Sequence, residues 1–262
     1  MVDEHVVVEW VRPNVAFVRL NRPQKRNALC VTLLEQLHSA IIEVTNSASA
    51  RVVILGGAGP VFCAGLDLTE AIDSNKSEHL MSRFSSILDS LLSSDLVTIC
   101  AVHGGAHAGG LGLLAACDLV VVTEDSRFSL PEVRRGLTPA VVTALLRRQI
   151  PDRPLRELIL LSEAIDAERA VAIGLVSRVV PAEQLENSAI QMATAAIAGG
   201  PHSIANSKRL LDGQPSGNLV DELHSAVTQH LSARESTEVE EGINAFLEKR
   251  APKWKQSSQP DA

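Results

Sequence analysis

The stretch that decides the fold is HGGAHAGGLGLLAACD, residues 103–118, which directly follows the apolar run VTICAV at 97–102. It contains five glycines and four alanines, and its one acidic residue stands at the far end. The run before it is typical of a buried strand, and the residues after Gly109 are typical of a helix. Because glycine lets a backbone approach a ligand closely, this junction predicts backbone groups that are presented to a ligand.

A second glycine-rich loop, GGAGPVFCAGLD at 56–67, follows another strand-like run, VVIL at 52–55. Either loop alone is more typical of a tight turn with close helix packing. Together they suggest that a helix beginning near Gly109 offers free N–H groups and its positive dipole end to an anionic centre. A further N–H at Leu66 could complete an oxyanion hole, in which each donor is worth roughly 3–4 kcal/mol.

A dinucleotide site is the competing interpretation of the same glycines. Gly110, Gly112 and Ala115 fit the pattern GxGxxA. Seven residues separate Val102 from Gly110, however, whereas that fingerprint needs its first glycine at the strand end. The spacing therefore disfavours dinucleotide binding.

Composition narrows the class of protein. The chain has 262 residues, a net charge of −7, 45% hydrophobic residues and no tyrosine, so we expect one main globular domain and no nucleic-acid binding. The four cysteines form no CxxC pair, which argues against a metal site or a disulfide framework. The acidic N-terminus resembles no signal or transit peptide, and no apolar run is long enough for a membrane span. We therefore expect a cytoplasmic protein without membrane contact.

The hydrophobic periodicity predicts strands and helices that alternate, followed by a helical tail. Helix 31–44 carries Thr32 as its candidate cap, and the hairpin at the N-terminus turns at Pro13-Asn14. The expected strands are 6–11, 15–20, 52–55, 97–102, 119–123, 126–130 and 176–180, and a further amphipathic helix covers 77–92.

We expect two regions, a core at 1–198 and a C-terminal helical oligomerisation region at 199–262. The latter contains the amphipathic segments 218–233 and 239–250. Their apolar faces need a partner, which is either the core or another subunit.

Six segments occur in the order seen in the enoyl-CoA hydratase/isomerase, or crotonase, superfamily, and the chain resembles that family from about Val15 to Arg250. The segments are NRPQKRNAL (21–29), FCAGLDL (62–68), HGGAHAGGLGLLAACDLVV (103–121), FSLPEVRRGL (128–137), AIDAERAVAIGLVSRVVP (164–181) and FLEKR (246–250). The resemblance implies an α/β fold, a spiral of ββα units with a C-terminal helical extension. It also implies an acyl-CoA thioester substrate, and coenzyme A enters as part of that substrate rather than as a separate cofactor.

The resemblance also assigns roles to individual positions. The N–H groups of Leu66 and Gly109 would bind the thioester oxygen and stabilise an enolate. Positions that would contact coenzyme A are Lys25, Arg26, Ala28, Ala64, Phe246 and Lys249. The last two often reach the ligand from a neighbouring subunit, and the family usually forms trimers or pairs of trimers, so we expect a homotrimer or homohexamer.

The acid–base groups decide the reaction. Family hydratases have two glutamates, and this sequence keeps one, Glu132 in LPEV, while Gly112 stands at the other position. A glycine cannot carry a proton, so the two-carboxylate mechanism cannot operate as in those hydratases. One carboxylate beside an apolar wall is sufficient for double-bond isomerisation, because burial raises its pKa toward neutrality.

Several alternatives remain open at this point. Hydration or dehydration could use Glu132 with a helper such as His107. A dehydratase of a branched, carboxylated acyl thioester would use Arg134 and Arg135 to bind the second carboxylate. A dehalogenase is disfavoured, because the position of the nucleophilic aspartate in the related dehalogenases corresponds to about Ala140 in this chain. A non-catalytic acyl-CoA-binding protein is the alternative outside enzymes, and the retained glutamate argues against it.

Three other polar residues receive structural interpretations. Cys63 is expected to be a small packing residue, because no base is predicted near it. Asp67 is expected to brace its loop through hydrogen bonds to backbone. His230, in the helical tail, is expected at the surface or an interface.

Overall fold

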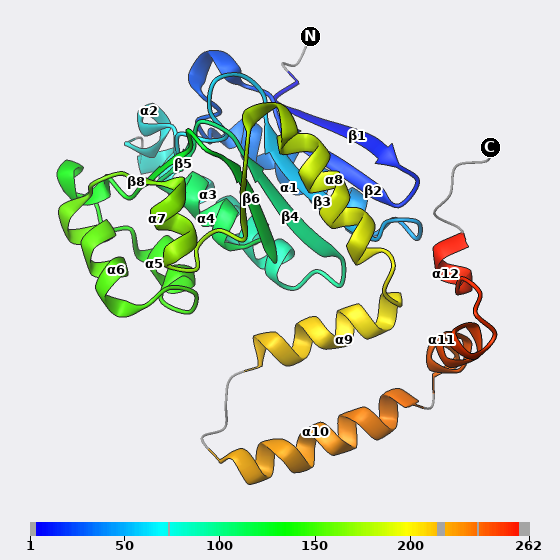
Figure 1. Cartoon of the computed structure of the whole chain (residues 1–262). Helices are drawn as coiled ribbons and strands as arrows, with labels where there is room; N and C mark the ends of the chain where they lie inside the picture. Colours follow the sequence, from blue (N-terminus) through cyan, green and yellow to red (C-terminus); the bar gives the residue numbers. More distant parts are fainter. Residues whose placement is uncertain (1–3, 73, 214–217, 235, 257–262) are drawn as a thin grey trace.

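The computed structural model describes residues 4–72, 74–213, 218–234 and 236–256. A twisted sheet with helices on both faces forms the body, and the last four helices extend away from it (Figure 1). The strands are β1 (Val6–Arg12), β2 (Val15–Leu20), β3 (Val52–Gly57), β4 (Val97–Val102), β5 (Gly105–His107), β6 (Leu119–Thr123), β7 (Arg127–Ser129), β8 (Ile165–Asp166) and β9 (Arg178–Val180).

The helices divide between the body and the tail. Those of the body are η1 (Pro23–Lys25), α1 (Val31–Thr45), α2 (Leu68–Ala71), α3 (Ser74–Leu92), α4 (Gly109–Ala115), η2 (Glu132–Arg135), α5 (Ala140–Leu146), α6 (Asp152–Arg156), η3 (Glu157–Leu161), α7 (Ala167–Ala172), η4 (Ala182–Gln184) and α8 (Leu185–Ala196). Those of the tail are α9 (Pro201–Asp212), α10 (Leu219–Arg234), α11 (Thr237–Leu247) and α12 (Lys253–Gln256).

Two sheets organise the body, and their topology agrees with the predicted α/β class. The larger has the order β1-β2-β3-β4-β6-β9, in which β1 is antiparallel to β2 and the other pairs are parallel. The smaller has the order β5-β7-β8. Because β2, β3 and β4 are parallel, the loops that follow them emerge at one edge of the sheet. That edge carries the two glycine-rich loops.

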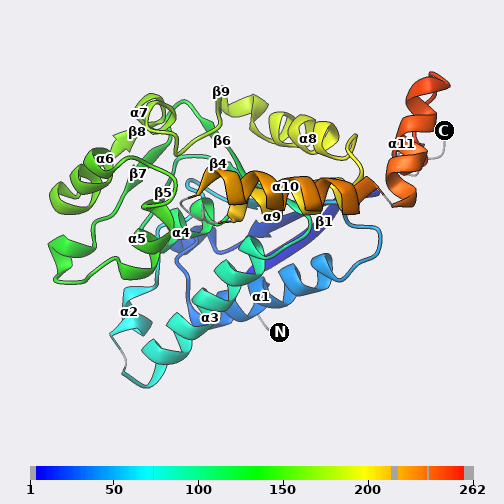
Figure 2. The ribbon, with the colours of Figure 1, turned by 90° about the horizontal axis from the view of Figure 1, so that it is seen from below.

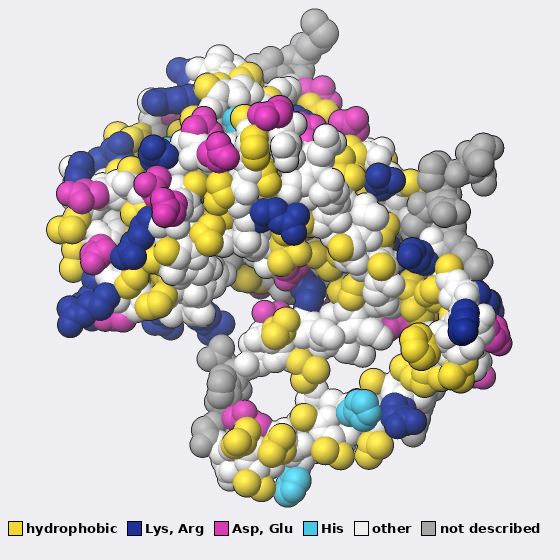
Figure 3. Space-filling view, in the orientation of Figure 1, with side chains coloured by type: hydrophobic (Ala, Val, Ile, Leu, Met, Phe, Trp, Pro, Cys, Tyr) yellow, Lys and Arg dark blue, Asp and Glu magenta, His cyan; other side chains and the backbone are white. Residues whose placement is uncertain are grey.

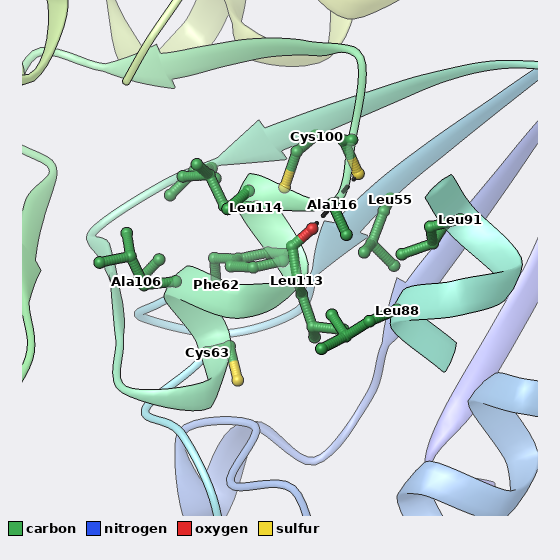
Figure 4. Close-up of a cluster of buried hydrophobic side chains, with 14 of the residues drawn as sticks. Leu55, Phe62, Cys63, Leu88, Leu91, Cys100, Ala106, Leu113, Leu114 and Ala116 are labelled. Carbon is green, nitrogen blue, oxygen red and sulfur yellow. Dashed lines mark hydrogen bonds between the residues drawn. The ribbon is translucent and has the colours of Figure 1, made fainter. Parts of the chain in front are cut away.

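Apolar side chains on alternate residues of β3 and β4 pack on opposite faces of the large sheet. Val53 and Leu55 belong to the cluster formed with α1, α3 and α4, whereas Val52 and Ile54 pack with α8. Every residue of β3 and β4 is buried, which explains their uninterrupted apolar sequence. Figure 4 shows Leu113 of α4 reaching toward Leu88 of α3, and both belong to the same buried cluster.

The structure corrects several sequence-based expectations in detail. Thr32 does not cap α1: the helix begins after Cys30, and the carboxylate of Glu70 accepts the Val31 N–H at 2.7 Å instead. The last strand is shorter than 176–180: it covers only Arg178–Val180, and just before it Ser177 accepts the Val120 N–H through its side-chain hydroxyl. The short strand β8 was not predicted, since two residues carry no periodicity.

The tail is attached to the body at a few points. Lys208 of α9 is buried, and its Nζ donates to Leu96 O at 2.6 Å and to Asp118 Oδ2 at 2.7 Å. Within the tail itself, Glu238 of α11 accepts the His202 and Ser203 N–H groups at the start of α9. By contrast, α10 contains no buried residue. The views in Figures 1 and 2 agree that α10 runs beside α9 and outside the body.

Candidate active site

The N–H of Leu66 points away from Leu29, with which the residues on either side of Leu66 form a short parallel bridge. Leu29 donates its N–H to Gly65 O at 2.8 Å and accepts the Asp67 N–H at 3.0 Å. In such a parallel bridge the residue between the two partners directs its own polar groups to the other side. Within the described part of the chain, the Leu66 N–H is not donated to any other protein group.

A second free donor is the N–H of Gly109, the first residue of α4. The preceding Ala108 N–H bonds to Ser129 O at 3.0 Å, and the Leu111 and Gly112 N–H groups bond back to Ala108 O. The Gly109 N–H has no acceptor among the described residues and lies at the positive end of the helix. It is therefore available to bind a negatively charged oxygen.

Gly65 brings these two donors together. Its φ is +95°, and a Cβ there would lie 2.7 Å from Ala108 Cβ and 3.3 Å from Gly109 N. The backbone before Leu66 is thus packed directly against the start of α4, which a larger residue would prevent. The predicted pairing of Leu66 with Gly109 has the proximity and the unused donors that an oxyanion hole requires.

Glu132 stands at the start of η2, three residues after the end of β7. Because β7 pairs with β5 and Ser129 O binds Ala108 N–H, this segment lies beside the Gly109 donor. Glu132 Oε2 is buried and has no hydrogen-bond partner among the described residues. Burial raises the pKa of Glu132, although its own backbone N–H and Arg135 act in the opposite direction. A half-buried carboxylate with one buried, free oxygen is suited to accept and return a proton.

Position 112 lies in an apolar environment. A Cβ on Gly112 would lie 2.9 Å from Phe84 Cζ and 3.2 Å from Val142 Cγ2. Phe84 Cζ is also 3.5 Å from the corresponding position on Gly109. The space that a second carboxylate would occupy is therefore filled by hydrocarbon.

His107 is oriented by Ser129 rather than by a carboxylate. Its Nδ1 lies 2.8 Å from Ser129 Oγ, and burial together with the charge of Arg26 lowers the pKa of its imidazole. A neutral imidazole held in this way is a weak candidate for the second acid. His107 stays a predicted helper without further support from the geometry.

The basic turn after β2 adjoins the oxyanion loop. Ala64 donates its N–H to Arg26 O at 3.0 Å, and the side chains of Lys25 and Arg26 are exposed. Asn27, fully buried with φ +53°, donates its amide to the carbonyls of Ala58, Val61 and Phe62. The turn that holds the predicted contacts Lys25, Arg26, Ala28 and Ala64 is thus rigidly joined to the site.

Phe246 and Lys249 are not brought to this turn by their own chain. Phe246 is 82% exposed on α11, and Lys249 follows the same helix. Figure 1 places α11 beyond the end of α8, far from β5 and α2. If these residues contact the ligand, they do so in a neighbouring copy.

The remaining predicted residues have structural roles. Cys63 is buried, and burial raises the pKa of its thiol to about 12, as expected for a packing residue. Asp67 Oδ1 accepts the Thr69 N–H at 3.1 Å and so caps α2, which agrees with its predicted bracing role. Arg134 donates to Leu161 O, and His230 is exposed on α10.

Sequence reasoning missed Arg22 and Phe84. Arg22 pairs with Asp67 at 2.7 Å, but it stands among the other basic residues of its turn and carries no distinguishing pattern. Phe84 is one apolar residue on the buried face of an amphipathic helix. No local signal shows that its ring reaches α4.

Within residues 4–72, 74–213, 218–234 and 236–256, no group of three His, Cys, Asp or Glu side chains is arranged to hold a metal ion. No helix in the same ranges is long and apolar enough to cross a membrane.

Comparison with known proteins gives consistent matches. The family model for enoyl-CoA hydratase/isomerase matches residues 11–258. A putative enoyl-CoA hydratase of Thermus thermophilus is 33% identical over 254 residues, covering 95% of this chain and 100% of that protein. The mitochondrial enoyl-CoA hydratase domain-containing protein 3 of Rattus norvegicus is 31% identical, covering 90% and 79%. The crystal structure of an enoyl-CoA hydratase from Bacillus anthracis superposes with a TM-score of 0.90 at 31% identity, covering 96% and 99%.

Proposed function

We propose, from the premise that this chain belongs to the enoyl-CoA hydratase/isomerase family, that it isomerises the double bond of an enoyl-CoA with one carboxylate. The observation that carries the proposal is the buried, unpartnered Oε2 of Glu132, together with the hydrocarbon that fills the space at position 112. The thioester oxygen binds the N–H groups of Leu66 and Gly109. Glu132 removes a proton from C2 and returns it to C4, while the two donors stabilise the enolate.

The wall formed by Phe84 and Val142 favours isomerisation over hydration. Hydration adds water across the double bond. It therefore needs a second group, at another position, that activates the water or supplies the proton. In family hydratases that group is a glutamate, and here its place contains the phenyl ring. The apolar surface offers no hydrogen bond to hold a reacting water there.

Hydration or dehydration is the second candidate, because relatives at about 30% identity are named enoyl-CoA hydratases. In that case His107, held by Ser129, is the group to test as the helper. An acyl-CoA-binding protein without catalysis is the third, and it would bind the thioester without turnover.

The test compares a 2-enoyl-CoA with a 3-enoyl-CoA in deuterated water, followed by NMR and mass spectrometry. Migration of the double bond with deuterium uptake and no added water supports isomerisation. The Glu132→Gln variant should abolish it while acyl-CoA binding persists. Addition of water by the wild type would instead support hydration, and binding without turnover across several chain lengths would support the non-catalytic alternative.

The exposed apolar residues of α10 and α11 support a homo-oligomer, which we propose to be a trimer or a pair of trimers. Leu219, Leu223, Val227 and Leu231 of α10 are each more than half exposed. Figure 3 shows hydrophobic side chains on the outside of this helix. A surface of this kind is typical of an interface. Such an assembly could place Phe246 and Lys249 near a neighbour's basic turn; the cytoplasmic location stays a prediction.

A further inference from the structure

We propose that Arg22 and Asp67 form a positioning pair that holds the Leu66 N–H in the oxyanion hole and cancels the charge beside it. The inference rests on the proposed function. Asp67 directly follows Leu66, and Arg22 belongs to the turn after β2. Arg22 Nη1 donates to Asp67 Oδ2 at 2.7 Å, and both side chains are largely buried, at 15% and 13% exposure.

The contacts of Asp67 fix the backbone that carries the donor. Its N–H bonds to Leu29 O, its Oδ1 accepts the N–H and hydroxyl of Thr69, and its Oδ2 accepts Arg22. Gly65, on the other side of Leu66, accepts the Leu29 N–H. Rotation of the Leu66 peptide would therefore break contacts on both sides. Displacement of about 1 Å in such a group can reduce a rate about 100-fold.

Arg22 is itself held in place by the same loops. Its Nη1 also donates to Ala28 O at 3.0 Å, and its backbone N–H donates to Asn27 Oδ1 at 2.8 Å. The amide of Asn27 in turn binds three carbonyls of the loop that leads to Gly65. The guanidinium thus joins the turn after β2 to the oxyanion loop. Both side-chain bonds come from the same guanidinium nitrogen, Nη1.

The pair has an electrostatic role that a purely structural contact would lack. The carboxylate of Asp67 is one residue from an N–H that must stabilise developing negative charge. Without Arg22, that carboxylate would be partly buried and uncompensated, and it would oppose the oxyanion. Removal of both charges should therefore be less damaging than removal of Arg22 alone.

The experiment compares Arg22→Met, Asp67→Asn and the double variant in the full-length protein. The control is Arg156→Met, which removes an exposed ion pair with Asp152 on α6. Three quantities are measured: kcat and KM for the turned-over enoyl-CoA, the ultraviolet absorbance of the enolate formed by bound acetoacetyl-CoA, and Tm. The enolate absorbance reports the oxyanion hole without requiring turnover.

We expect Arg22→Met to lower kcat by about 10–100-fold with KM changed by less than about threefold, and to reduce the bound enolate. The double variant should recover at least about fivefold in kcat relative to Arg22→Met. The pair's role would be overturned if Arg22→Met kept the kcat and the enolate absorbance of the wild type. It would also be overturned if the double variant recovered no kcat relative to Arg22→Met. If Arg22→Met does not fold, the isosteric variant Asp67→Asn still tests the role of the pair. Enolate absorbance equal to that of the wild type would overturn that role. A loss of more than about 100-fold in kcat would overturn it as well.

Failure of the proposed function gives a different result. In that case the wild-type protein itself would neither bind acetoacetyl-CoA nor polarise it, whatever the variants do. That outcome overturns the pair's role together with the function. If the wild type polarises bound acetoacetyl-CoA and Arg22→Met does so to the same extent, only the pair's role is overturned.

Discussion

The ring of Phe84 occupies the space into which a side chain at position 112 would project, with its Cζ 2.9 Å from the place of a Cβ. Phe84 is 1% exposed and belongs to the main core cluster, so it cannot move aside without cost. The loss of the second glutamate and the presence of this ring are therefore two parts of one packing arrangement. Restoring the glutamate alone would not restore a two-carboxylate site.

Gly112→Glu should accordingly destabilise the protein by about 3 kcal/mol or more, because it combines overpacking with a buried charge. Added to Phe84→Ala, the same substitution should cost at least about 1 kcal/mol less than it does alone. Denaturant midpoints for both single variants and the double variant measure this coupling. Ser82→Glu, on the exposed side of α3, controls for the added charge. Wild-type stability of Gly112→Glu would show that the position is open.

Gly65→Ala should reduce both stability and activity. At φ +95° an alanine is strained, and its Cβ would overlap Ala108 at 2.7 Å, so we expect a loss of about 2–4 kcal/mol. Displacement of Leu66 or Gly109 should lower kcat by about 100-fold or more. The matched control is Gly174→Ala, which has φ +83° but whose nearest contact is at 3.7 Å. An equal effect of the two substitutions on kcat would contradict the close packing of the donors.

Glu132→Gln should abolish turnover and yet raise Tm at pH 8. Burial raises the pKa of Glu132 in the folded state, so the native protein binds its proton more tightly than the unfolded chain does. Such a group lowers stability once the pH exceeds its folded pKa, and it has no such effect below the unfolded pKa. We expect a difference of about 1 kcal/mol, or roughly 2–4 °C, at pH 8. The difference should vanish near pH 4, as measured by calorimetry; a constant difference across this range would exclude the carboxylate as its source.

The pH profile of kcat/KM should have an acid limb with a midpoint above 4.5, the ordinary value for a glutamate. The base must be ionised in the free enzyme, and burial favours its protonated form. Arg135 opposes this shift, so Arg135→Met should move the limb to still higher pH. Arg156→Met should leave the profile unchanged. A limb at or below 4.5 would indicate that the buried carboxylate is not the base.

Local patterns predicted the elements around the site better than the site's walls. The runs 52–55 and 97–102 predicted two buried strands, because a parallel strand covered on both faces contains only apolar residues. The glycines predicted close backbone approach, and Gly65 provides it. Phe84 and Arg22 were missed because their roles depend on contacts with residues 28 and 45 positions away, which leave no periodic signal.

The tail shows the same limit and leads to the last prediction. Its amphipathic pattern predicted that the apolar faces pack against a partner. The same pattern is expected whether that partner is the core of the same chain or a second copy of the protein. In the structure none of the residues of α10 is buried, and Leu223 and Val227 are 55% and 57% exposed one turn apart. Unpartnered apolar surface of this kind favours self-association.

Leu223→Glu/Val227→Glu should therefore convert the assembly into monomers, because two like charges would face the interface. Size-exclusion chromatography with light scattering measures the mass, and circular dichroism checks that the body remains folded. The control is Gln229→Glu, an exposed polar position on the same helix. If Phe246 and Lys249 act on a neighbour's ligand, the monomer should also bind acyl-CoA at least about tenfold more weakly. A wild-type protein that is monomeric at micromolar concentration would contradict both the interface and the shared site.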